Sequence, residues 1–594
     1  MTKLPGKLLR IALVFPPAMP PTSPPLGIAG LKSYLEAEAN VEVRNFDLNL
    51  AYFQQAFGWI DDRRIRMRIK KMDIETTAGK VVAARSSFLG KEGLSRFFDL
   101  TDYNEHAGTY AAFSSVFNGL FDSFARRVLV GLPIPPLAGR FFDELIEPVR
   151  AFRPDLVGFS ILFSQQLFFA LALAKLCAAP PTWSGHALAG SPRALGEAPQ
   201  IVFGGATFSV MPDPGRLLTG PVPVYLGDEP REVNIGQLID YLIVGEGERG
   251  LEALARRAAR GQAAVAGSQA YGIAAGERND ADESIPGLLH IKNGKAVRNP
   301  AEAALDLNAL SLPDFSDFPL DRYHSPVPVL PYLSSRGCPW RRCAFCTHQK
   351  TYLNYREEDA ATTAERLSAL QEKYGVSHFC LIDEMVHPRR LGQIAAHIIR
   401  KDVQVYFAAY AKPSGFSPEV LERAHRAGLR LMMWGLESSS QRILDLMCKG
   451  TDANKMATIL ESSSKAGVWN LLFLIFGFPT ETREEWVSTL DFVESLGSSV
   501  HALSRSRFVL LEGSEVFLNP QHFGIKRIID RPQRDPVSIA YDYEVSEGLT
   551  QEEVSVMFRE VLVRLSNVGR SPWFGQFREH MLLFASKRKS CRQD

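Results

Sequence analysis

Apolar segments that predict strands alternate with amphipathic segments that predict helices through the second half of this chain. The predicted strands are residues 377–382, 403–410, 429–434 and 470–476. The predicted helices are residues 365–374, 418–428, 440–447 and 484–495. Because alternating strands and helices form a parallel sheet that the helices cover, we expect an α/β fold with a parallel sheet or barrel here. Ligands of such folds bind at the carboxyl ends of the strands.

The first half of the chain predicts a second parallel sheet. Its strands are expected at residues 9–15, 41–46, 156–161, 200–203 and 241–244, with a helix at 28–37. The nearly continuous apolar run of residues 9–15 is typical of a strand that is buried on both faces. A nucleotide-binding Rossmann domain is one interpretation. However, a proline-rich loop at residues 16–27 follows the first strand, where that domain would have Gly-x-Gly-x-x-Gly.

Three of the seven cysteines lie within nine residues, at Cys338, Cys343 and Cys346. Short runs of cysteine thiolates hold iron–sulfur clusters, and three thiolates leave one iron of a four-iron cluster without a protein ligand. A zinc site with His348 as fourth ligand is the alternative, although no second Cys/His pair follows at zinc-finger spacing. A disulfide is disfavoured, because the chain is large, poor in cysteine and shows no signal-peptide pattern.

The cysteine segment and the strand–helix units after it resemble the radical S-adenosylmethionine (SAM) enzymes. The usual spacing in that family is C-x₃-C-x₂-C with an aromatic residue before the last cysteine, a position that Phe345 matches. The first gap here is one residue longer. The segments at residues 435–438 and 476–481 look like the SAM-binding strand ends of the family. The resemblance implies a partial (β/α) barrel.

The first half of the chain resembles the cobalamin-binding domain that precedes the radical SAM domain in one subclass. The resemblance rests on the proline-rich loop, the Gly204-Gly205 pair and the strand end at residues 245–248, which occur in that order. It implies a Rossmann-like fold that binds cobalamin. Many cobalamin proteins supply a histidine below cobalt from a D-x-H-x-x-G sequence, which is missing here. Since His106 and His186 lack the required neighbours, we predict cobalamin without a histidine ligand.

The resemblance implies a [4Fe-4S] cluster, SAM and cobalamin, in the form of methylcobalamin, as cofactors. The three cysteines would ligate the cluster and are the predicted catalytic residues. The implied SAM contacts are Phe345, Asp383, Glu384, Lys412, Glu437, Ser438 and Gly477. The implied cobalamin contacts are Pro25, Leu26, Ser160, Gly204, Gly205, Thr207, Gly245, Glu246 and Gly247. For each acidic residue, a solvated strand end or a helix cap is the alternative.

The resemblance also implies a reaction. Reductive cleavage of SAM would give a 5′-deoxyadenosyl radical that removes a substrate hydrogen, and methylcobalamin would then supply a methyl group to carbon. A rearrangement, cyclisation or oxidation without methylation is one alternative, and a radical SAM oxidoreductase without cobalamin is another. A zinc-stabilised interaction protein is the alternative from a different class. The expected substrate is a small-molecule or peptide natural product, and the expected electron donor is a flavodoxin or ferredoxin.

The length of 594 residues predicts two to four domains. We expect a cobalamin-binding domain at 1–261 with a helical insertion at 51–150, a linker with a hairpin at 262–328, the barrel at 329–540 and a helical extension at 541–594. The insertion would pack on its parent domain or, alternatively, cover a ligand, and residues 179–199 would form a surface loop. A net charge of +1 and the absence of long apolar runs predict no nucleic-acid or membrane partner. We expect a monomer, and the low cysteine content without a signal-peptide pattern predicts a cytoplasmic location.

Overall fold

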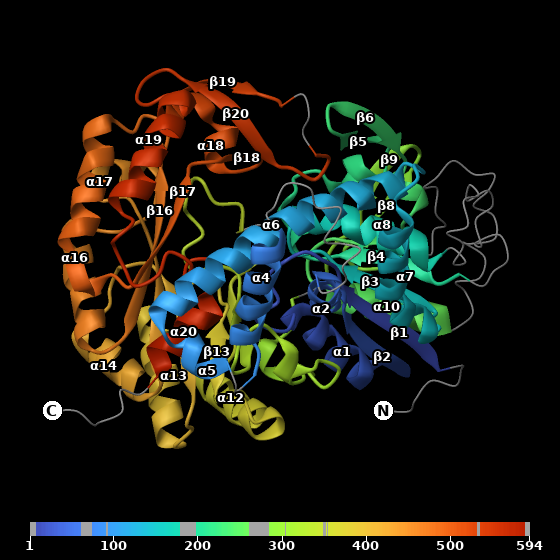
Figure 1. Cartoon of the computed structure of the whole chain (residues 1–594), viewed down its shortest axis with the longest axis horizontal. Helices are drawn as coiled ribbons and strands as arrows, with labels where there is room; N and C mark the ends of the chain where they lie inside the picture. Colours follow the sequence, from blue (N-terminus) through green and yellow to red (C-terminus); the bar gives the residue numbers. More distant parts are fainter. Residues whose placement is uncertain are drawn as a thin grey trace.

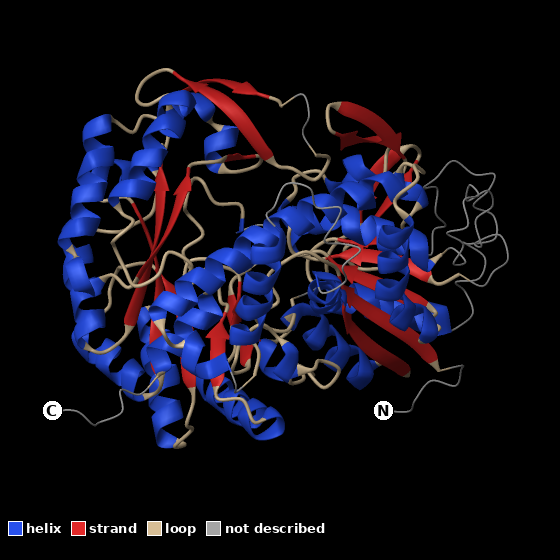
Figure 2. Ribbon diagram, viewed as in Figure 1, coloured by secondary structure: helices blue, strands red, loops and turns tan. Residues whose placement is uncertain are grey.

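The computed structural model describes residues 8–60, 74–90, 93–178, 198–259, 284–302, 304–348, 352, 354–531 and 535–587. Two sheets surrounded by helices lie side by side (Figures 1 and 2). The N-terminal half builds the first sheet and the C-terminal half builds the second. The predicted α/β class, with a Rossmann-like domain before a partial barrel, is confirmed.

The first sheet has the strand order β2-β1-β3-β4-β7-β8-β9. Its parallel strands are β1 (Leu9–Phe15), β2 (Val41–Asp47), β3 (Leu156–Ser160), β4 (Gln200–Gly204) and β7 (Tyr241–Ile243). β8 (Leu288–Lys292) and β9 (Lys295–Arg298) add an antiparallel hairpin to β7. Asn293 and Gly294 form its turn with φ angles of 52° and 71°, as an Asn-Gly hairpin turn requires. The hairpin that was expected in a linker therefore extends this sheet.

Both faces of the first sheet are covered, as its apolar strands predict. Alternate residues of β1 point to opposite sides. Leu9, Ile11 and Leu13 share an apolar cluster with α1 (Leu26–Glu38) and α10 (Gly247–Ala259). Ala12 and Val14 belong to the cluster that contains α8 (Leu167–Cys177).

The predicted helical insertion forms a layer that contacts both halves of the protein. Its helices are α2 (Leu48–Ile60), α4 (Ile74–Phe88), α5 (Leu94–Phe97), α6 (Leu100–Leu129) and α7 (Pro136–Ala151). α6 packs on α8 of the first domain. Phe97 and Tyr103 also pack against Phe584 of the C-terminal helix α20 (Arg578–Ser586), with ring centroids 5.3 and 5.1 Å apart. The insertion therefore joins its parent domain to the C-terminal end of the chain.

The second sheet is parallel, with the strand order β10-β13-β14-β15-β16-β17. Its strands are β10 (Val329–Tyr332), β13 (His378–Leu381), β14 (Tyr406–Ala411), β15 (Leu429–Glu437), β16 (Trp469–Phe476) and β17 (Ala502–Arg507). The helices that follow them are α12 (Ala360–Tyr374), α13 (Pro388–Arg400), α14 (Pro418–Arg426), the short α15 (Gln441–Leu446) with α16 (Ala453–Lys465), and α17 (Arg483–Ser495). β10 and β17 are the two edges, so the barrel is partial.

Side-chain alternation gives this barrel two apolar faces. Phe407 and Met432 lie in the cluster that contains the outer helices. Ala408 and Met433 lie in the other cluster, together with α20 and the helical insertion. α20 contacts β13, β14 and β15. The C-terminal helix and the insertion therefore occupy the inner side of the barrel.

The chain after the barrel is only partly helical. β20 (Ala540–Val545) pairs antiparallel with β18 (Leu510–Leu511) and β19 (Ile525–Ile529), and only then do α19 (Gln551–Arg564) and α20 follow. The prediction of a helical extension from residue 541 was therefore wrong for its first residues. Tyr541, Tyr543 and Val545 alternate with acidic residues, which is the pattern of a strand.

Some predictions fall outside the described residues. These include most of the predicted surface loop (179–197) and the first part of the predicted linker (262–283). No helix in the described ranges is long and apolar enough to cross a membrane.

Candidate functional site

A short antiparallel pair of strands begins and ends the segment that carries the three cysteines. β11 (Ser335–Arg336) pairs with β12 (Arg356–Glu357), so Arg336 lies opposite Arg356. Gly337 follows with a φ of 83°, and a Cβ atom there would lie 3.2 Å from the backbone oxygen of Asn354. A side chain at this position would be strained. We call residues 337–348 the cysteine loop.

The three thiols of this loop are close enough to one another to shift each other's pKa values. Burial raises the pKa of the Cys343 thiol, and the neighbouring Cys338 raises it further. Burial also raises the pKa of Cys346 to about 12, with a smaller contribution from each of the other two thiols. The loop is held by its backbone, because Ala344 N–H donates to the oxygen of Met447 at 2.9 Å.

A single zinc ion would need its ligands to converge on one point. In the part of the chain that the structure describes, no three His, Cys, Asp or Glu side chains converge as the ligands of one ion would. Cysteines of a cluster bind different irons, so they need not converge on one point. His348, the candidate fourth zinc ligand, is exposed, and its Nδ1 lies 3.3 Å from Oε2 of Glu384. The zinc alternative gains no support from this geometry.

A buried lysine that sequence reasoning did not select lies beside the cysteines. Nζ of Lys449 lies 2.7 Å from Oε1 of Glu437 and 5.8 Å from the centroid of the Phe345 ring. Burial alone would lower the pKa of Lys449, but the charge of Glu437 and the Cys343 thiol outweigh this effect and raise it. A cation therefore faces the cysteine loop. In the sequence, this lysine follows the predicted helix 440–447, where a solvated side chain is the ordinary expectation.

Lys412 lies next to this pair but has other partners. Its Nζ donates to the backbone oxygens of Lys449 and Gly450 at 3.1 and 3.0 Å. It also lies 3.2 Å from the centroid of the Trp340 ring, a cation–π contact. Burial lowers the pKa of Lys412 to about 8. Lys412 thus ties the cysteine loop to the 449–450 turn, and its contact with a SAM carboxylate stays a prediction.

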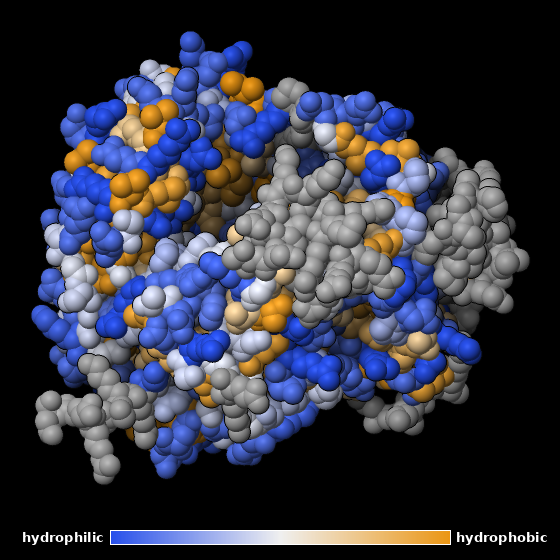
Figure 3. Space-filling model, viewed as in Figure 1, coloured by the Kyte–Doolittle hydropathy of each residue, from blue (hydrophilic) through white to orange (hydrophobic). Residues whose placement is uncertain are grey.

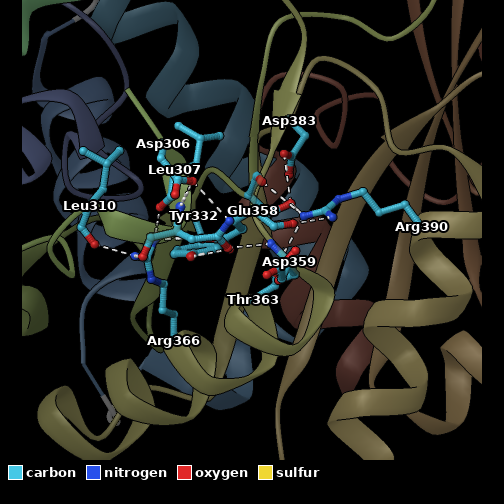
Figure 4. A network of polar contacts seen from close by, with 12 residues as sticks. Asp306, Leu307, Leu310, Tyr332, Glu358, Asp359, Thr363, Arg366, Asp383 and Arg390 are labelled. Atoms are coloured by element: carbon cyan, nitrogen blue, oxygen red, sulfur yellow. Dashed lines mark hydrogen bonds and ion pairs between the residues drawn. The ribbon is translucent and has the colours of Figure 1, made fainter. Parts of the chain in front are cut away.

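Asp383 belongs to a buried polar network at the start of the cysteine loop (Figure 4). Its Oδ1 accepts hydrogen bonds from the hydroxyls of Ser334 and Ser335 at 3.1 and 2.5 Å. Arg390 donates to Ser334 and to the backbone oxygen of Glu358. Burial raises the pKa of Asp383, and its Oδ2 has no partner among the described residues. Asp383 therefore holds β11 in place and keeps one oxygen available to a further donor.

Two of the predicted SAM contacts, Ser438 and Gly477, are engaged in the wall of the barrel. The Ser438 hydroxyl is buried and lies 3.3 Å from Oγ1 of Thr489 on α17. Gly477 N–H donates to Oε2 of Glu481 at 2.5 Å. Both residues stabilise the connections between strands and helices, a role that the sequence motifs alone did not distinguish from ligand contact.

Glycines with positive φ angles follow two strands at the carboxyl ends of the first sheet. Gly205 has a φ of 111°, and a Cβ atom there would lie 2.3 Å from the backbone oxygen of Ile161. Gly245 has a φ of 101°. Thr207 on α9 (Ala206–Val210) is buried, and its hydroxyl has no hydrogen-bond partner among the described residues. A buried hydroxyl without a partner calls for an explanation, and a bound ligand would satisfy it. This geometry fits the predicted cobalamin site.

The proline-rich loop lies against the same edge of the first sheet. Pro25 and Leu26 lead into α1, and a Cβ atom at Gly27 would lie 3.7 Å from Oγ of Ser160 at the end of β3. Gly204 ends the adjacent strand β4. His106 lies on α6, where burial lowers its pKa, and His186 is outside the described residues.

The side chain of Glu246 pairs with two arginines of the barrel, and its contact with cobalamin stays a prediction. Its Oε2 accepts a hydrogen bond from Nη1 of Arg336 at 2.6 Å, and its Oε1 accepts one from Nη2 of Arg356. Both carboxylate oxygens therefore face the base of the cysteine loop. The sequence could not predict these partners, because the two arginines lie 90 and 110 residues away in the chain. The contact also brings the carboxyl edge of the first sheet against the loop.

On the face in Figure 3, apolar residues line a hollow between the regions of β17 and α6.

Comparison with known proteins agrees with this architecture. Residues 332–493 match the model of the radical SAM superfamily. A protein from Pyrococcus horikoshii, named an uncharacterized methyltransferase, is 24% identical over 360 residues, which are 60% of this chain and 67% of that protein. The chain therefore carries a radical SAM domain.

Solved structures extend the likeness to the whole fold. One match is the cobalamin-dependent SAM radical enzyme OxsB, solved with aqua-cobalamin and SAM. It has a TM-score of 0.59 at 14% identity, and the match covers 94% of this chain and 67% of the OxsB chain. A second match is the radical SAM methyltransferase TsrM from Kitasatospora setae, solved with cobalamin and a [4Fe-4S] cluster. It has a TM-score of 0.53 at 16% identity and covers 86% of this chain and 74% of the TsrM chain. The chain has the fold of the cobalamin-dependent radical SAM enzymes.

Proposed function

We propose that this protein is a cobalamin-dependent radical SAM methyltransferase that transfers a methyl group to a carbon atom of a small-molecule or peptide natural product. The observation that carries the proposal is the contact between the two halves. The carboxyl edge of the first sheet, which carries the predicted cobalamin contacts, lies against the cysteine loop of the barrel. The folds of OxsB and TsrM and the methyltransferase name of the Pyrococcus relative support the same class.

The residues of the chain bind and orient under this proposal. Cys338, Cys343 and Cys346 would hold the cluster, and Lys449 would offset the negative charge of the thiolates. Asp383 and Glu437 would accept hydrogen bonds from the amine or ribose of SAM. When bound, the cofactors supply reductive cleavage of SAM and a transferable methyl group, which protein side chains cannot supply.

The first sheet would hold cobalamin through backbone contact. Gly204, Gly205 and Gly245 would contact the ligand through their backbone, and the Thr207 hydroxyl would gain the partner it lacks among the described residues. The inner side of the barrel is closed by α20 and the helical insertion, which would exclude water from the reacting atoms. The proposal includes a flavodoxin or ferredoxin as electron donor and a monomeric, cytoplasmic enzyme.

The test is anaerobic reconstitution of the full chain with iron, sulfide and hydroxocobalamin, followed by an assay of SAM cleavage to 5′-deoxyadenosine with dithionite. We expect the parent protein to cleave SAM. The rate of SAM cleavage should fall about a hundredfold in Cys343→Ala, because the variant lacks one ligand of the metal centre. Cys448→Ala is the matched control, since Cys448 is an exposed cysteine beside the loop. A parent without iron or without SAM cleavage would overturn the proposal.

The methyl transfer itself is tested by product mass once a substrate is found. Methylation adds the mass of one CH₂ group and consumes a second SAM to restore methylcobalamin. A product of unchanged mass or with two fewer hydrogens would favour the rearranging, cyclising or oxidising alternative.

A further inference from the structure

Two arginines face each other where the cysteine loop begins and ends. Arg336 and Arg356 are directly opposite in the antiparallel pair of β11 and β12. Like charges in such positions repel and destabilise the pairing. Their side chains are mostly shielded from solvent, at 13% and 17% exposed, so water screens this repulsion poorly. The strand pair that frames the cysteines therefore needs negative charge from elsewhere.

The first domain supplies that charge through Glu246 and Glu248. Glu246 bridges both arginines, with Arg336 Nη1 at 2.6 Å from Oε2 and Arg356 Nη2 donating to Oε1. Glu248 accepts a second hydrogen bond from Arg336, through Nη2. These carboxylates are 17% and 10% exposed. Two positive and two negative groups thus form one neutral, shielded cluster across the domain boundary.

The two glutamates are held where they can act on the loop. Glu248 lies in the first turn of α10, where the helix dipole favours a carboxylate. Glu246 stands between Gly245 and Gly247, and Gly245 N–H donates to the hydroxyl of Ser209 at 3.1 Å. On the other side of the contact, Arg336 is two residues before Cys338.

We infer that Glu246 and Glu248 are positioning residues that hold the base of the cysteine loop closed from the neighbouring domain. The arrangement of the thiols then depends on the docking of the first domain and is not a property of the barrel alone. The consequence for cluster geometry rests on the proposed function, whereas the closure of the loop rests only on the contacts described above.

The first test measures hydrogen exchange of the amides of residues 337–348 in the full chain before reconstitution. We expect Glu246→Gln to speed exchange in this loop by about tenfold, because an uncompensated arginine remains at its base. Arg356→Gln in the same chain should restore most of the protection, since it removes the opposing charge while Glu248 still pairs with Arg336. Unchanged exchange in Glu246→Gln, or no recovery in the double variant, would overturn the inference.

Asp317→Asn is the matched control. Asp317 forms a shielded ion pair with Lys32 at 2.7 Å, between α1 and the segment before the barrel, and it also accepts a hydrogen bond from Asn45 N–H at 2.9 Å, so these partners lie outside the loop. This variant should lower the melting temperature without changing exchange in residues 337–348. If it loosens the loop as much as Glu246→Gln does, the effect is general loss of domain docking and the inference fails.

The second test uses reconstituted protein. We expect the electron paramagnetic resonance spectrum of the reduced cluster, and its change on addition of SAM, to differ between the parent and Glu246→Gln but not between the parent and Asp317→Asn. A spectrum of Glu246→Gln identical to that of the parent would overturn the role in cluster positioning. If the parent takes up no iron, the proposed function fails, while the exchange experiment still decides whether the loop is held closed by Glu246.

Discussion

Glu437 and Lys449 form a buried ion pair directly beside the three cysteines, with Oε1 and Nζ 2.7 Å apart and side chains only 8% and 10% exposed. Glu437 adopts a positive φ of 67° at the end of β15. The pair also explains Gly435, because a Cβ atom there would lie 2.7 Å from Nζ of Lys449. The strand end is therefore shaped around this pair, and a larger residue at position 435 would displace it.

Breaking the pair on one side should destabilise the protein more than replacing both partners. Lys449→Met leaves a buried carboxylate without a cation, which costs about 3–5 kcal/mol, whereas apolar replacement of both groups is often neutral. We expect scanning calorimetry to show a clear fall in melting temperature for Lys449→Met and a smaller one for Lys449→Met/Glu437→Leu. Equal falls in the two variants would mean that the charges are already compensated by water.

Thr207 offers a second test, in which stability and binding should change in opposite directions. Thr207→Val keeps the shape of the side chain but removes a buried hydroxyl that has no partner among the described residues. The protein without cobalamin should become more stable by about 1 kcal/mol, because the unpaired hydroxyl is gone. Hydroxocobalamin should bind about fivefold more weakly, because the variant lacks one hydrogen bond to it. Equilibrium dialysis and calorimetry measure the two quantities.

Ser209→Ala is the control for Thr207→Val. The Ser209 hydroxyl accepts from Gly245 N–H at 3.1 Å and donates to the oxygen of Gly205 at 3.4 Å, so its loss should lower stability. If Thr207→Val also lowers the stability of the protein without cobalamin, its hydroxyl already has a partner and the cobalamin contact loses its support.

Two buried histidines should make the protein less stable in mild acid. Burial lowers the pKa of His324 to about 3 and that of His580 to about 4, both well below the ordinary value of 6.5. Both residues lie where the insertion meets α20. Nδ1 of His324 lies 2.7 Å from Oη of Tyr110 in the insertion, and His580 on α20 donates through Nε2 to the backbone oxygen of His324 at 2.6 Å. Protonation in the folded state would therefore place a charge in an apolar interface.

The sign of the pH effect follows from the lowered pKa values. The unfolded chain binds these protons near pH 6.5 and the folded chain does not, so stability is retained above that pH and falls as the pH drops toward 4. Each histidine should contribute a loss of about 2 kcal/mol at pH 5 relative to pH 8. His580→Gln can keep the hydrogen bonds without titrating, so its melting temperature should depend less on pH over this range. The same pH dependence as in the parent would show that the interface opens before it protonates.

Much of the fold could be predicted from the sequence, because the apolar segments are the strands that are buried in the sheets. The strand at residues 9–15 is apolar except for Arg10 and pairs with a neighbour on each side, and the strand that begins at Leu429 is predicted for the same reason. The prediction was wrong at β20, where a strand lies among turns and before two helices, and the overall helical character of the segment concealed its alternation.

The site could be predicted only where its residues are close in sequence. Spacing alone reveals Cys338, Cys343 and Cys346, because the loop brings them together locally. Lys449 and the partners of Glu246 reach the site through the packing of separate elements, so their charges look like ordinary solvated ones in the sequence. The motif around Glu246 is visible in the sequence, but the partners of Glu246 depend on how the two sheets dock, which no local pattern encodes.

The contact between Arg578 and Tyr410 provides the last prediction, on how α20 is held inside the barrel. Nη1 of Arg578, in the first turn of α20, donates to the hydroxyl of Tyr410 on β14 at 2.7 Å. The guanidinium carbon also lies 5.1 Å from the centroid of the Phe473 ring, which stacks on Tyr410. Tyr410→Phe removes the acceptor of a largely buried charged donor, at a cost of about 1.5–3 kcal/mol. Amide exchange in residues 578–586 should therefore accelerate. Tyr406→Phe makes the same change on the same strand, at a hydroxyl with no hydrogen bond to any described residue, and should leave α20 protected. Equal exchange in the two variants would mean that the apolar contacts of α20 hold the helix without the Arg578 hydrogen bond.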